Sequence, residues 1–317
     1  MEKNQLKSGV ILSYGNILIG NIISIAYTPI MLRLLGQNEY GLYQLVASVV
    51  SYLGLFNFGF GSTYIRFHSE RRVKKEEEKI AVLNGMFLSI FLILGLIALV
   101  TGVILTGYTG SIFAQSLTSG EIETAKVLML LMVLNIALSF PISVFDCYIM
   151  AYEQFFFQRI LTLTQTILNP FLALPLLLMG YHSVALVVVT TFLTVMKLIF
   201  NMWFCIHKHH MRFIFRGFEL KKIKEIWIFS SYIFINMIVD QINWSVDKFL
   251  LGKMLGTVSV AIYAVAANLN VYYMNFSTSI SSVFIPRVNY LVASGKEDQE
   301  LTKLFTKVGR IQFYVLS

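Results

Sequence analysis

Long uncharged runs separated by short charged segments are the main pattern of this sequence. Because about 20 apolar residues cross the hydrocarbon core of a bilayer, each run predicts one membrane-spanning helix. The stretch 160–196 is too long for one helix, and Gly180, Tyr181 and His182 divide it by a tight turn. The predicted helices, in chain order, cover residues 8–32, 41–65, 80–105, 125–148, 160–179, 183–205, 226–248 and 258–285, and a ninth begins near residue 301.

A short pattern occurs twice along the chain. The run Arg33-Leu34-Leu35-Gly36 returns as Lys253-Met254-Leu255-Gly256, and a tyrosine follows each glycine, at Tyr43 and at Tyr263. A long charge-free run comes next in both places. Agreement over this length indicates a duplicated unit. Since the copies begin at the first and the seventh predicted helix, the repeat predicts two helical lobes related by an axis along the membrane normal.

The repeat divides the chain into three parts. Residues 1–206 form an N-terminal lobe of six helices, residues 207–225 a basic cytoplasmic linker, and residues 226–317 the start of a C-terminal lobe. We expect this second lobe to be incomplete, with about two and a half helices. Within the linker, residues 218–227 mix apolar and charged side chains in the pattern of an amphipathic helix lying on the inner membrane surface.

Composition agrees with the helix pattern. Hydrophobic residues make up 56% of the chain and charged residues 13%, with a mean hydropathy of +0.70. A soluble globular protein has about a quarter of its residues charged. The chain is therefore predicted to be an all-α polytopic membrane protein, in which helices satisfy the backbone hydrogen bonds inside the lipid.

The basic residues predict the orientation. Most of the 25 Lys and Arg lie in alternate loops on the same side as the N-terminus, whereas Arg33, Lys126, Lys248 and Lys253 lie on the other side and Lys197 lies within a helix. The positive-inside rule then places the N-terminus and the linker in the cytoplasm. The formal net charge of +8 follows from topology. No basic soluble domain is evident, so nucleic-acid binding is not expected.

Three segments carry a resemblance to a known family. Residues 34–67 (LLGQNEYGLYQLVASVVSYLGLFNFGFGSTYIRF), 247–266 (DKFLLGKMLGTVSVAIYAVA) and 283–291 (VFIPRVNYL) look like the Wzx-like polysaccharide flippases of the multidrug, oligosaccharidyl-lipid and polysaccharide (MOP) exporter superfamily. The resemblance covers essentially the whole chain, although the last helices of that family are missing here.

That resemblance implies a two-lobe, MATE-like helical bundle around a central cavity. It implies export of undecaprenyl-pyrophosphate-linked oligosaccharide from the inner to the outer leaflet of a bacterial plasma membrane. The implied partners are this substrate, membrane lipids, a coupling proton or sodium ion, and other polysaccharide-assembly proteins. It implies neither an enzyme nor a bound cofactor or metal.

Polar side chains on the predicted helices are the first candidates for a transport path. On the eighth helix, Asn268, Tyr272 and Asn275 recur at intervals of four and three and share one face. We interpret this face as cavity lining. The first helix carries Asn16, Gly20, Ser24 and Thr28 at every fourth position, a pattern typical of close helix packing.

Charges at membrane depth are the second set of candidates, because each costs about 2.5–3.5 kcal/mol on insertion scales. Our hypothesis is that Lys197 attracts the lipid-linked phosphate. Asp240 either pairs with Lys197 or takes up the coupling ion, a role for which Asp247 is a second candidate. Asp146 and Glu153 flank the inner end of the fourth helix near Arg159, where we expect local pairing.

Charges at the helix ends have two interpretations each. Arg66 ends the second helix on the inner side, where it receives the phosphate or serves as an ordinary interfacial anchor. Arg33 and Asp247 lie at the outer mouth with Lys248 and Lys253, as gate contacts between lobes or as exposed interfacial charges.

Other functions remain as alternatives. A multidrug or organic-cation antiporter of the same superfamily would share the fold, but it typically needs acidic residues in its first helices, and the first three predicted spans carry no charge. A membrane enzyme such as a polysaccharide polymerase needs a larger extramembrane domain than these short loops provide. A scaffold in envelope assembly is the remaining class.

Overall fold

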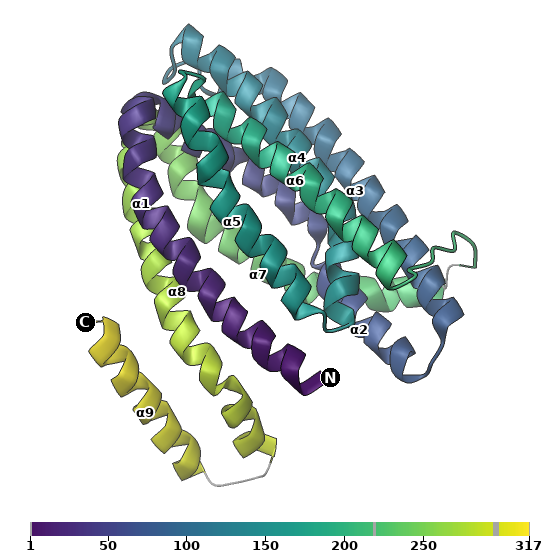
Figure 1. Ribbon diagram of the computed structural model, residues 1–317. Helices are drawn as coiled ribbons and strands as arrows, with labels where there is room; N and C mark the ends of the chain where they lie inside the picture. Colours follow the sequence, from purple (N-terminus) through teal and green to yellow (C-terminus); the bar gives the residue numbers. More distant parts are fainter. Residues whose placement is uncertain (1, 218–219, 294–297, 317) are drawn as a thin grey trace.

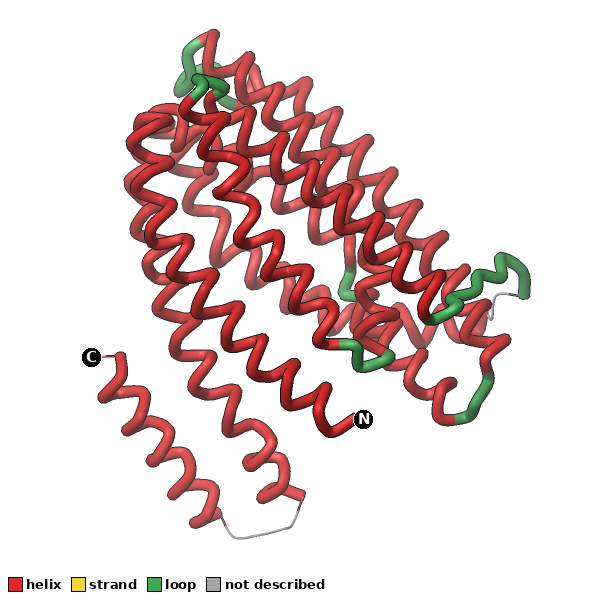
Figure 2. The backbone as a smooth tube through the Cα atoms, in the orientation of Figure 1, coloured by secondary structure: helices red, strands yellow, loops and turns green. Residues whose placement is uncertain are grey.

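The computed structural model describes residues 2–217, 220–293 and 298–316, which form a bundle of long helices joined by short loops (Figures 1 and 2). In chain order the elements are α1 (Glu2–Ser51), a 3-10 helix (Tyr52–Asn57), α2 (Phe60–Val73), α3 (Glu77–Ile112), α4 (Ser119–Ala151), α5 (Phe155–Leu178), α6 (His182–Trp203), a π-helical turn (Phe204–Lys208), α7 (Leu220–Leu255), α8 (Thr257–Ala293) and α9 (Asp298–Leu316).

Six helical stretches among the described residues are long and apolar enough to cross a membrane, so the chain is a multi-pass membrane protein. They are Gly15–Val73, Glu77–Ile112, Ser119–Ala151, Phe155–Leu178, His182–Lys208 and Thr257–Asn275. The first contains 59 residues and a turn, which is enough for two crossings. The predicted span 226–248 lies in α7, which is not among the six because polar residues such as Asn236 and Gln241 lower its mean hydropathy.

Both copies of the sequence repeat form the same kind of turn. Gly36 interrupts α1 with a φ of 77°, and Gly256 separates α7 from α8 with a φ of 81°. Glycine suits these left-handed positions because it has no Cβ. In Figure 1, α1 rises from the N-terminus and the chain then turns back toward α2. α1 therefore includes the first predicted helix, and its last part begins the second.

The predicted helix 41–65 is not continuous. It runs as the end of α1, the 3-10 helix and the start of α2, with left-handed backbone at Phe58 and Gly59. A Cβ on Gly59 would lie 2.8 Å from the Cβ of Ile233 in α7. The break thus occurs where another helix approaches too closely for a side chain, a constraint that the local pattern does not contain.

The predicted linker helix is continuous with the next helix. Residues 220–227, expected as an amphipathic helix on the inner surface, form the first turns of α7, while Phe218 and Glu219 lie outside the described residues. The preceding irregular segment is fastened to α3. The backbone N–H of Ile214 donates to the Ala81 carbonyl at 3.0 Å, and Asn84 Nδ2 donates to the Arg212 carbonyl at 3.0 Å.

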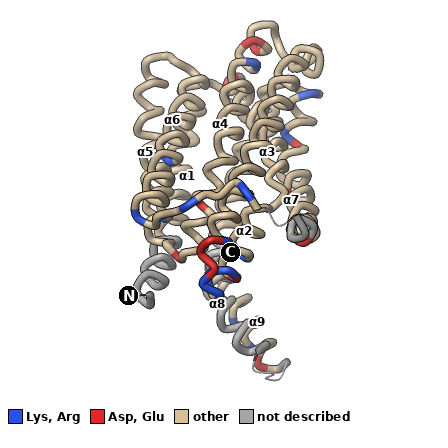
Figure 3. Tube along the Cα trace, turned by 90° about the vertical axis from the view of Figure 1, so that its right-hand side faces the viewer, with Lys and Arg blue, Asp and Glu red and all other residues tan. Residues whose placement is uncertain are grey.

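Apolar side chains lie both inside and outside the bundle. Tyr64, Phe60, Phe87 and Phe91 are fully buried between α2, α3 and α4, whereas α3 also exposes a face of large apolar residues. Such a face is expected where lipid replaces water as the solvent. In Figure 3, few charged residues lie in the middle of the bundle, and most of them lie toward one end.

The bundle has two ends and two groups of helices. The upper end contains the turns at Gly36, Gly180 and Gly256, and the lower end contains the loops 74–76, 152–154 and 209–217. The first block is α1–α6, and the second block is α7–α9.

Candidate functional site

The predicted polar face of α8 lies against α1. Asn268 Nδ2 donates to Tyr40 Oη at 3.2 Å, and Asn275 Nδ2 donates to Asn21 Oδ1 at 3.2 Å. Tyr272 Oη lies 3.3 Å from Thr28 Oγ1. We interpreted this face as cavity lining, but in this arrangement it joins the two blocks. The α1–α8 seam is the set of these three contacts.

The predicted polar face of α1 is divided between two neighbours. Asn16 Nδ2 donates to the Arg159 carbonyl at the start of α5 at 3.0 Å, and a Cβ on Gly20 would lie 3.8 Å from Thr166 in the same helix. Thr28, by contrast, belongs to the α1–α8 seam. Small and polar residues of α1 thus serve close helix packing, as their pattern predicts.

A second polar contact joins the blocks through α7. Gln241 Nε2 donates to Ser51 Oγ at 2.5 Å and to Ser245 Oγ at 2.7 Å. Further toward the lower end, Thr63 and Ser230 share a buried hydroxyl–hydroxyl hydrogen bond of 2.7 Å. The contacts of α7 with α2, and with Ser51 at the end of α1, are together called the α2–α7 seam.

Arg66 lies at the lower end of the α2–α7 seam. It is exposed, and its guanidinium carbon is 4.8 Å from the centroid of the Phe229 ring of α7. Cation–π contacts of this kind are worth about 0.5–1 kcal/mol at exposed sites. Arg66, a candidate both for phosphate binding and for an interfacial anchor, therefore contacts the second block directly.

Lys197 pairs with Asp146 and not with Asp240. Its Nζ is 2.7 Å from Asp146 Oδ2, and the two side chains are 21% and 19% exposed. Asn201 Nδ2 donates to Asp146 Oδ1 at 2.7 Å, with Gln158 Nε2 at 3.4 Å from the same oxygen. The expected pairing of Asp146 with Arg159 is also wrong, because α4 and α6 bring Asp146 to the depth of Lys197.

Asp146, Lys197, Asn201 and Gln158 are called the Asp146 cluster, and one buried polar atom in it lacks a hydrogen-bond partner. Asn201 is fully buried, and its Oδ1 has no hydrogen-bond partner. A buried acceptor without a donor is costly, so this oxygen is a natural contact for a water molecule. As a whole, the cluster holds one positive and one negative charge inside the first block.

The other predicted charges do not gather into one site. Asp240 is exposed on α7, and Arg33 is exposed near the upper end of α1. Asp247 accepts a short hydrogen bond from Tyr263 within the second block. Lys253 is exposed as well. Across the described ranges, no group of three His, Cys, Asp or Glu residues is placed to hold a metal ion.

The blocks also meet at the upper end, through glycines. A Cβ on Gly41 would overlap the Thr257 carbonyl group, and one on Gly252 would overlap the Leu45 side chain. A Cβ on Gly256 would lie 3.1 Å from the Ser116 carbonyl oxygen. At these glycines the backbone of one block lies so close to the other block that a larger residue would clash.

Two carboxylates organise the upper end, and the sequence analysis missed both. Glu39 Oε1 accepts from the Ser183 N–H and hydroxyl, each at 2.8 Å, and its Oε2 is 2.9 Å from His182 Nδ1. Glu121 closes a capping box with Thr118 and accepts from Thr257 Oγ1 of the second block at 3.1 Å. The available signal was the sequence Thr118-Ser119-Gly120-Glu121, which has capping-box spacing.

These carboxylates border a pocket of about 680 Å³ at the upper end. Its walls come from the α1 turn, the start of α4 and the α5–α6 turn, and they include Asn38, Thr124 and Tyr181. The volume lies in the usual range of small-molecule sites. All of its lining residues belong to the first block.

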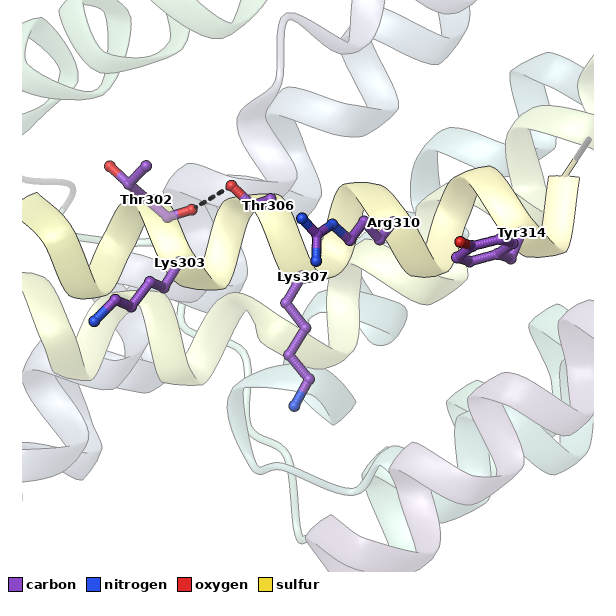
Figure 4. A pocket seen from close by; sticks show the side chains of 6 residues that line it. All are labelled: Thr302, Lys303, Thr306, Lys307, Arg310 and Tyr314. Carbon is purple, nitrogen blue, oxygen red and sulfur yellow. Dashed lines mark hydrogen bonds between the residues drawn. The ribbon is translucent and has the colours of Figure 1, made fainter.

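A cationic face runs along α9. Figure 4 shows Lys303, Lys307 and Arg310 on successive turns around a pocket of about 440 Å³, with Tyr314 at one end. α9 rests on α8 through Gln312, whose Nε2 donates to the Ser277 carbonyl at 3.1 Å. Lysine and arginine side chains grouped in this way carry the charge that anionic headgroups bind.

Aromatic rings and a histidine close the lower end of the first block. The His209 ring lies 5.2 Å from the Tyr152 centroid and 5.2 Å from the Phe204 centroid, and its Nε2 is buried without a partner. Burial, followed by the positive charges of Lys208 and Arg72, lowers the pKa of His209. The cluster fixes the segment that leads into the second block.

The fold is similar to that of several solved structures. One of them, described only as protein A, matches with a TM-score of 0.70 at 16% identity, covering 98% of this chain and 70% of that one. The MATE multidrug transporter DinF-BH matches with a TM-score of 0.65 at 16% identity, covering 91% and 65%. A MOP superfamily transporter from Pyrococcus furiosus matches with a TM-score of 0.62 at 17% identity, covering 87% and 63%.

These likenesses define the class: a multi-pass helical membrane protein with the MOP/MATE transporter fold. A family profile described as "Polysaccharide biosynthesis protein" matches residues 6–291. The chain belongs to this family. It spans less than two thirds of the length of DinF-BH and of the Pyrococcus furiosus transporter. No curated protein matches it.

Proposed function

We propose that the protein exports undecaprenyl-pyrophosphate-linked oligosaccharide repeat units from the inner to the outer leaflet of a bacterial plasma membrane, by alternating access of two lobes. Membership of the polysaccharide biosynthesis family supports a glycan substrate, and the MOP/MATE fold supports transport over catalysis. The observation that carries the proposal is the pair of polar seams between the first and second blocks.

In this proposal the lobes are residues 1–206 and residues 226–317, joined by the linker 207–225. The upper end faces outward and the N-terminus lies in the cytoplasm, as the distribution of basic residues predicts. The glycine contacts at the upper end hold the lobes together on the outer side. Export requires that these contacts separate so that the glycan can leave.

The seams supply the polar surface that a glycan needs. When the lobes meet, their amides and hydroxyls bond to one another, and when the lobes part, the same groups are available to water and to sugar hydroxyls. Interhelical hydrogen bonds in membranes average about 0.6 kcal/mol. The three contacts of the α1–α8 seam therefore hold the lobes by about 2 kcal/mol, which is weak enough to be reversible.

The charged residues take separate roles in this mechanism. Arg66, at the lower end beside α7, receives the pyrophosphate from the inner leaflet. Lys197 attracts phosphate only when Asp146 is neutralised, because the carboxylate otherwise occupies its ammonium group. Asp240 and Asp247 are the candidates for the coupling proton or sodium ion, and Arg33 for an outer contact.

A complementation experiment tests the proposal. Cells lacking the gene should lose surface polysaccharide and accumulate lipid-linked oligosaccharide in the inner leaflet, and the full-length protein should restore export. Lys197→Ala at normal protein level should abolish that restoration. Retained surface polysaccharide in the deletion strain would contradict the proposal, and drug sensitivity in its place would favour the antiporter alternative.

A further inference from the structure

The pocket at the upper end has features of a ligand site that the proposed transport path does not use. Its carboxylates are fixed in advance: Glu39 by Ser183 and His182, and Glu121 by Thr118 and Thr257. A carboxylate has about four lone-pair positions. Each of these carboxylates accepts three hydrogen bonds, which leaves acceptor capacity for a ligand without any need to reorganise the side chain.

The chemistry of the lining narrows the class of ligand. The pocket is lined by no Lys or Arg, so it does not suit a phosphate or another anion. Its two carboxylates do not form a metal site with the described residues around them. Asn38 and Thr124 add amide and hydroxyl groups that both donate and accept hydrogen bonds. A ligand with several hydroxyl groups matches this mixture.

An aromatic ring completes the site. The Tyr181 side chain lines the pocket from the α5–α6 turn and is 59% exposed. An exposed tyrosine offers an apolar ring face together with a polar hydroxyl. A pyranose has the complementary surface, with C–H groups on its faces and hydroxyls around its edge.

We propose that this pocket, lined by Asn38, Glu39, Thr118, Glu121, Thr124 and Tyr181, binds a neutral sugar unit of the glycan on the outer side of the membrane. The inference rests on the proposed function, because the glycan passes the upper end only if it is exported. Glu121 belongs both to the pocket and to the contact with Thr257. A sugar hydroxyl that bonds to the second lone pair of Glu121 Oε1 shares this oxygen with Thr257 and weakens the contact between the blocks.

The test uses the purified full-length protein and free sugars without a lipid or phosphate. The probes are a panel of neutral disaccharides and the oligosaccharide released from the lipid-linked intermediate, titrated by saturation-transfer NMR. Tyr181→Ala should weaken binding about 5- to 10-fold. Glu121→Gln keeps the capping-box spacing but removes the charged acceptor, and should weaken binding about 10-fold or more.

Two further variants sharpen the result. Thr257→Val frees Glu121 Oε1 and should tighten sugar binding about 2- to 10-fold. Tyr108→Ala is the matched control, because Tyr108 is 60% exposed on α3 and does not line the pocket. It should leave binding unchanged.

Three outcomes would overturn the proposal: no sugar binding to the wild-type protein, equal binding by all variants, or Tyr181-dependent binding of tetraphenylphosphonium in place of sugar. The complementation experiment separates this inference from the proposed function. Restored surface polysaccharide without sugar binding would refute the sugar site and leave the proposed function intact. Tyr181-dependent sugar binding without restored export would refute the proposed function and leave the sugar site intact.

Discussion

Replacing Gly41 with alanine tests whether glycine contacts hold the blocks together at the upper end. The new Cβ would lie 2.7 Å from the Thr257 carbonyl carbon, and this backbone group cannot move aside as a flexible side chain can. Overpacking of this kind costs about 1–3 kcal/mol. Alanine also stabilises a helix by about 1 kcal/mol relative to glycine, but this effect should cancel because Gly41 lies inside α1 and the proposed motion moves the blocks as units.

A cost of about 1–3 kcal/mol on the closed arrangement alone raises the population with a separated upper end by about 5- to 150-fold. A cysteine at Ser48 reports this population, since Ser48 is 5% exposed and lies about one turn from Leu45 and from Ser51, which meet Gly252 and Gln241 of the second block. The native Cys147 and Cys205 are buried. A membrane-impermeant maleimide added outside intact cells should then label the Gly41→Ala protein at least about five times faster.

Two glycine variants calibrate the experiment. Gly252→Ala should have a smaller effect, because its Cβ meets the Leu45 side chain, which can change rotamer. Gly107→Ala is the control, since a Cβ there meets nothing within 4 Å. An unchanged labelling rate in Gly41→Ala, at a membrane level equal to the parent protein, would refute the reasoning.

Three other predictions follow from single contacts. Thr63→Val leaves the buried Ser230 hydroxyl without its partner and should lower the free energy of unfolding by about 1–3 kcal/mol. Thr63→Val combined with Ser230→Ala should be nearly neutral. Additive effects of the two substitutions, in denaturation of the purified variants, would contradict this. Asp146→Asn leaves the Lys197 charge without its partner and should lower the free energy of unfolding by about 2–3 kcal/mol, less than for a fully buried pair. Asp146→Asn combined with Lys197→Met should recover most of this loss in thermal melts. No recovery would contradict the pairing. Because the pKa of His209 is lowered in the folded protein, the unfolded chain binds more protons as the pH falls toward and below about 6.5. Stability should therefore fall as the pH falls, and His209→Phe should reduce this pH dependence. Equal slopes for the two proteins, in melts from about pH 7.5 to about pH 5.5, would contradict this.

Sequence reasoning located the helices well where one physical effect decides their position. α3 and α4 extend the predicted spans 80–105 and 125–148 at both ends, and α6 begins at His182, within the predicted turn. In these places a charge-free run is sufficient, because lipid selects for length and hydropathy. Helix ends beyond the run depend on capping and on contacts outside the membrane, which the run does not encode.

Features that depend on a distant helix were not predicted. The break at Gly59 depends on the approach of Ile233. The sequence pattern of Asn268 and Tyr272 is the same for a face that meets water and for a face that packs on α1. The partner of Lys197 was within reach, however. Asp146 lies five residues before the end of α4 and Lys197 six before the end of α6, so both charges lie at similar depth from the lower end.

The carboxylates of the upper end were overlooked for a different reason. Glu39, Glu121 and His182 lie at or beside turns, where a charged side chain is usually just solvated. Only the packing of three turns shows that Glu39 and Glu121 each hold three donors and border a pocket.

The pair formed by Asp146 and Lys197 also has a consequence for how the protein is made. α4 leaves the ribosome before α6, so Asp146 reaches the membrane 51 residues ahead of the charge that neutralises it. Each unpaired charge costs about 2.5–3.5 kcal/mol at the centre of an isolated helix. Until α6 arrives, the Asp146 carboxylate is without the Lys197 ammonium group with which it pairs in the folded protein. Folding of the first block is thereby tied to the completion of its last helix.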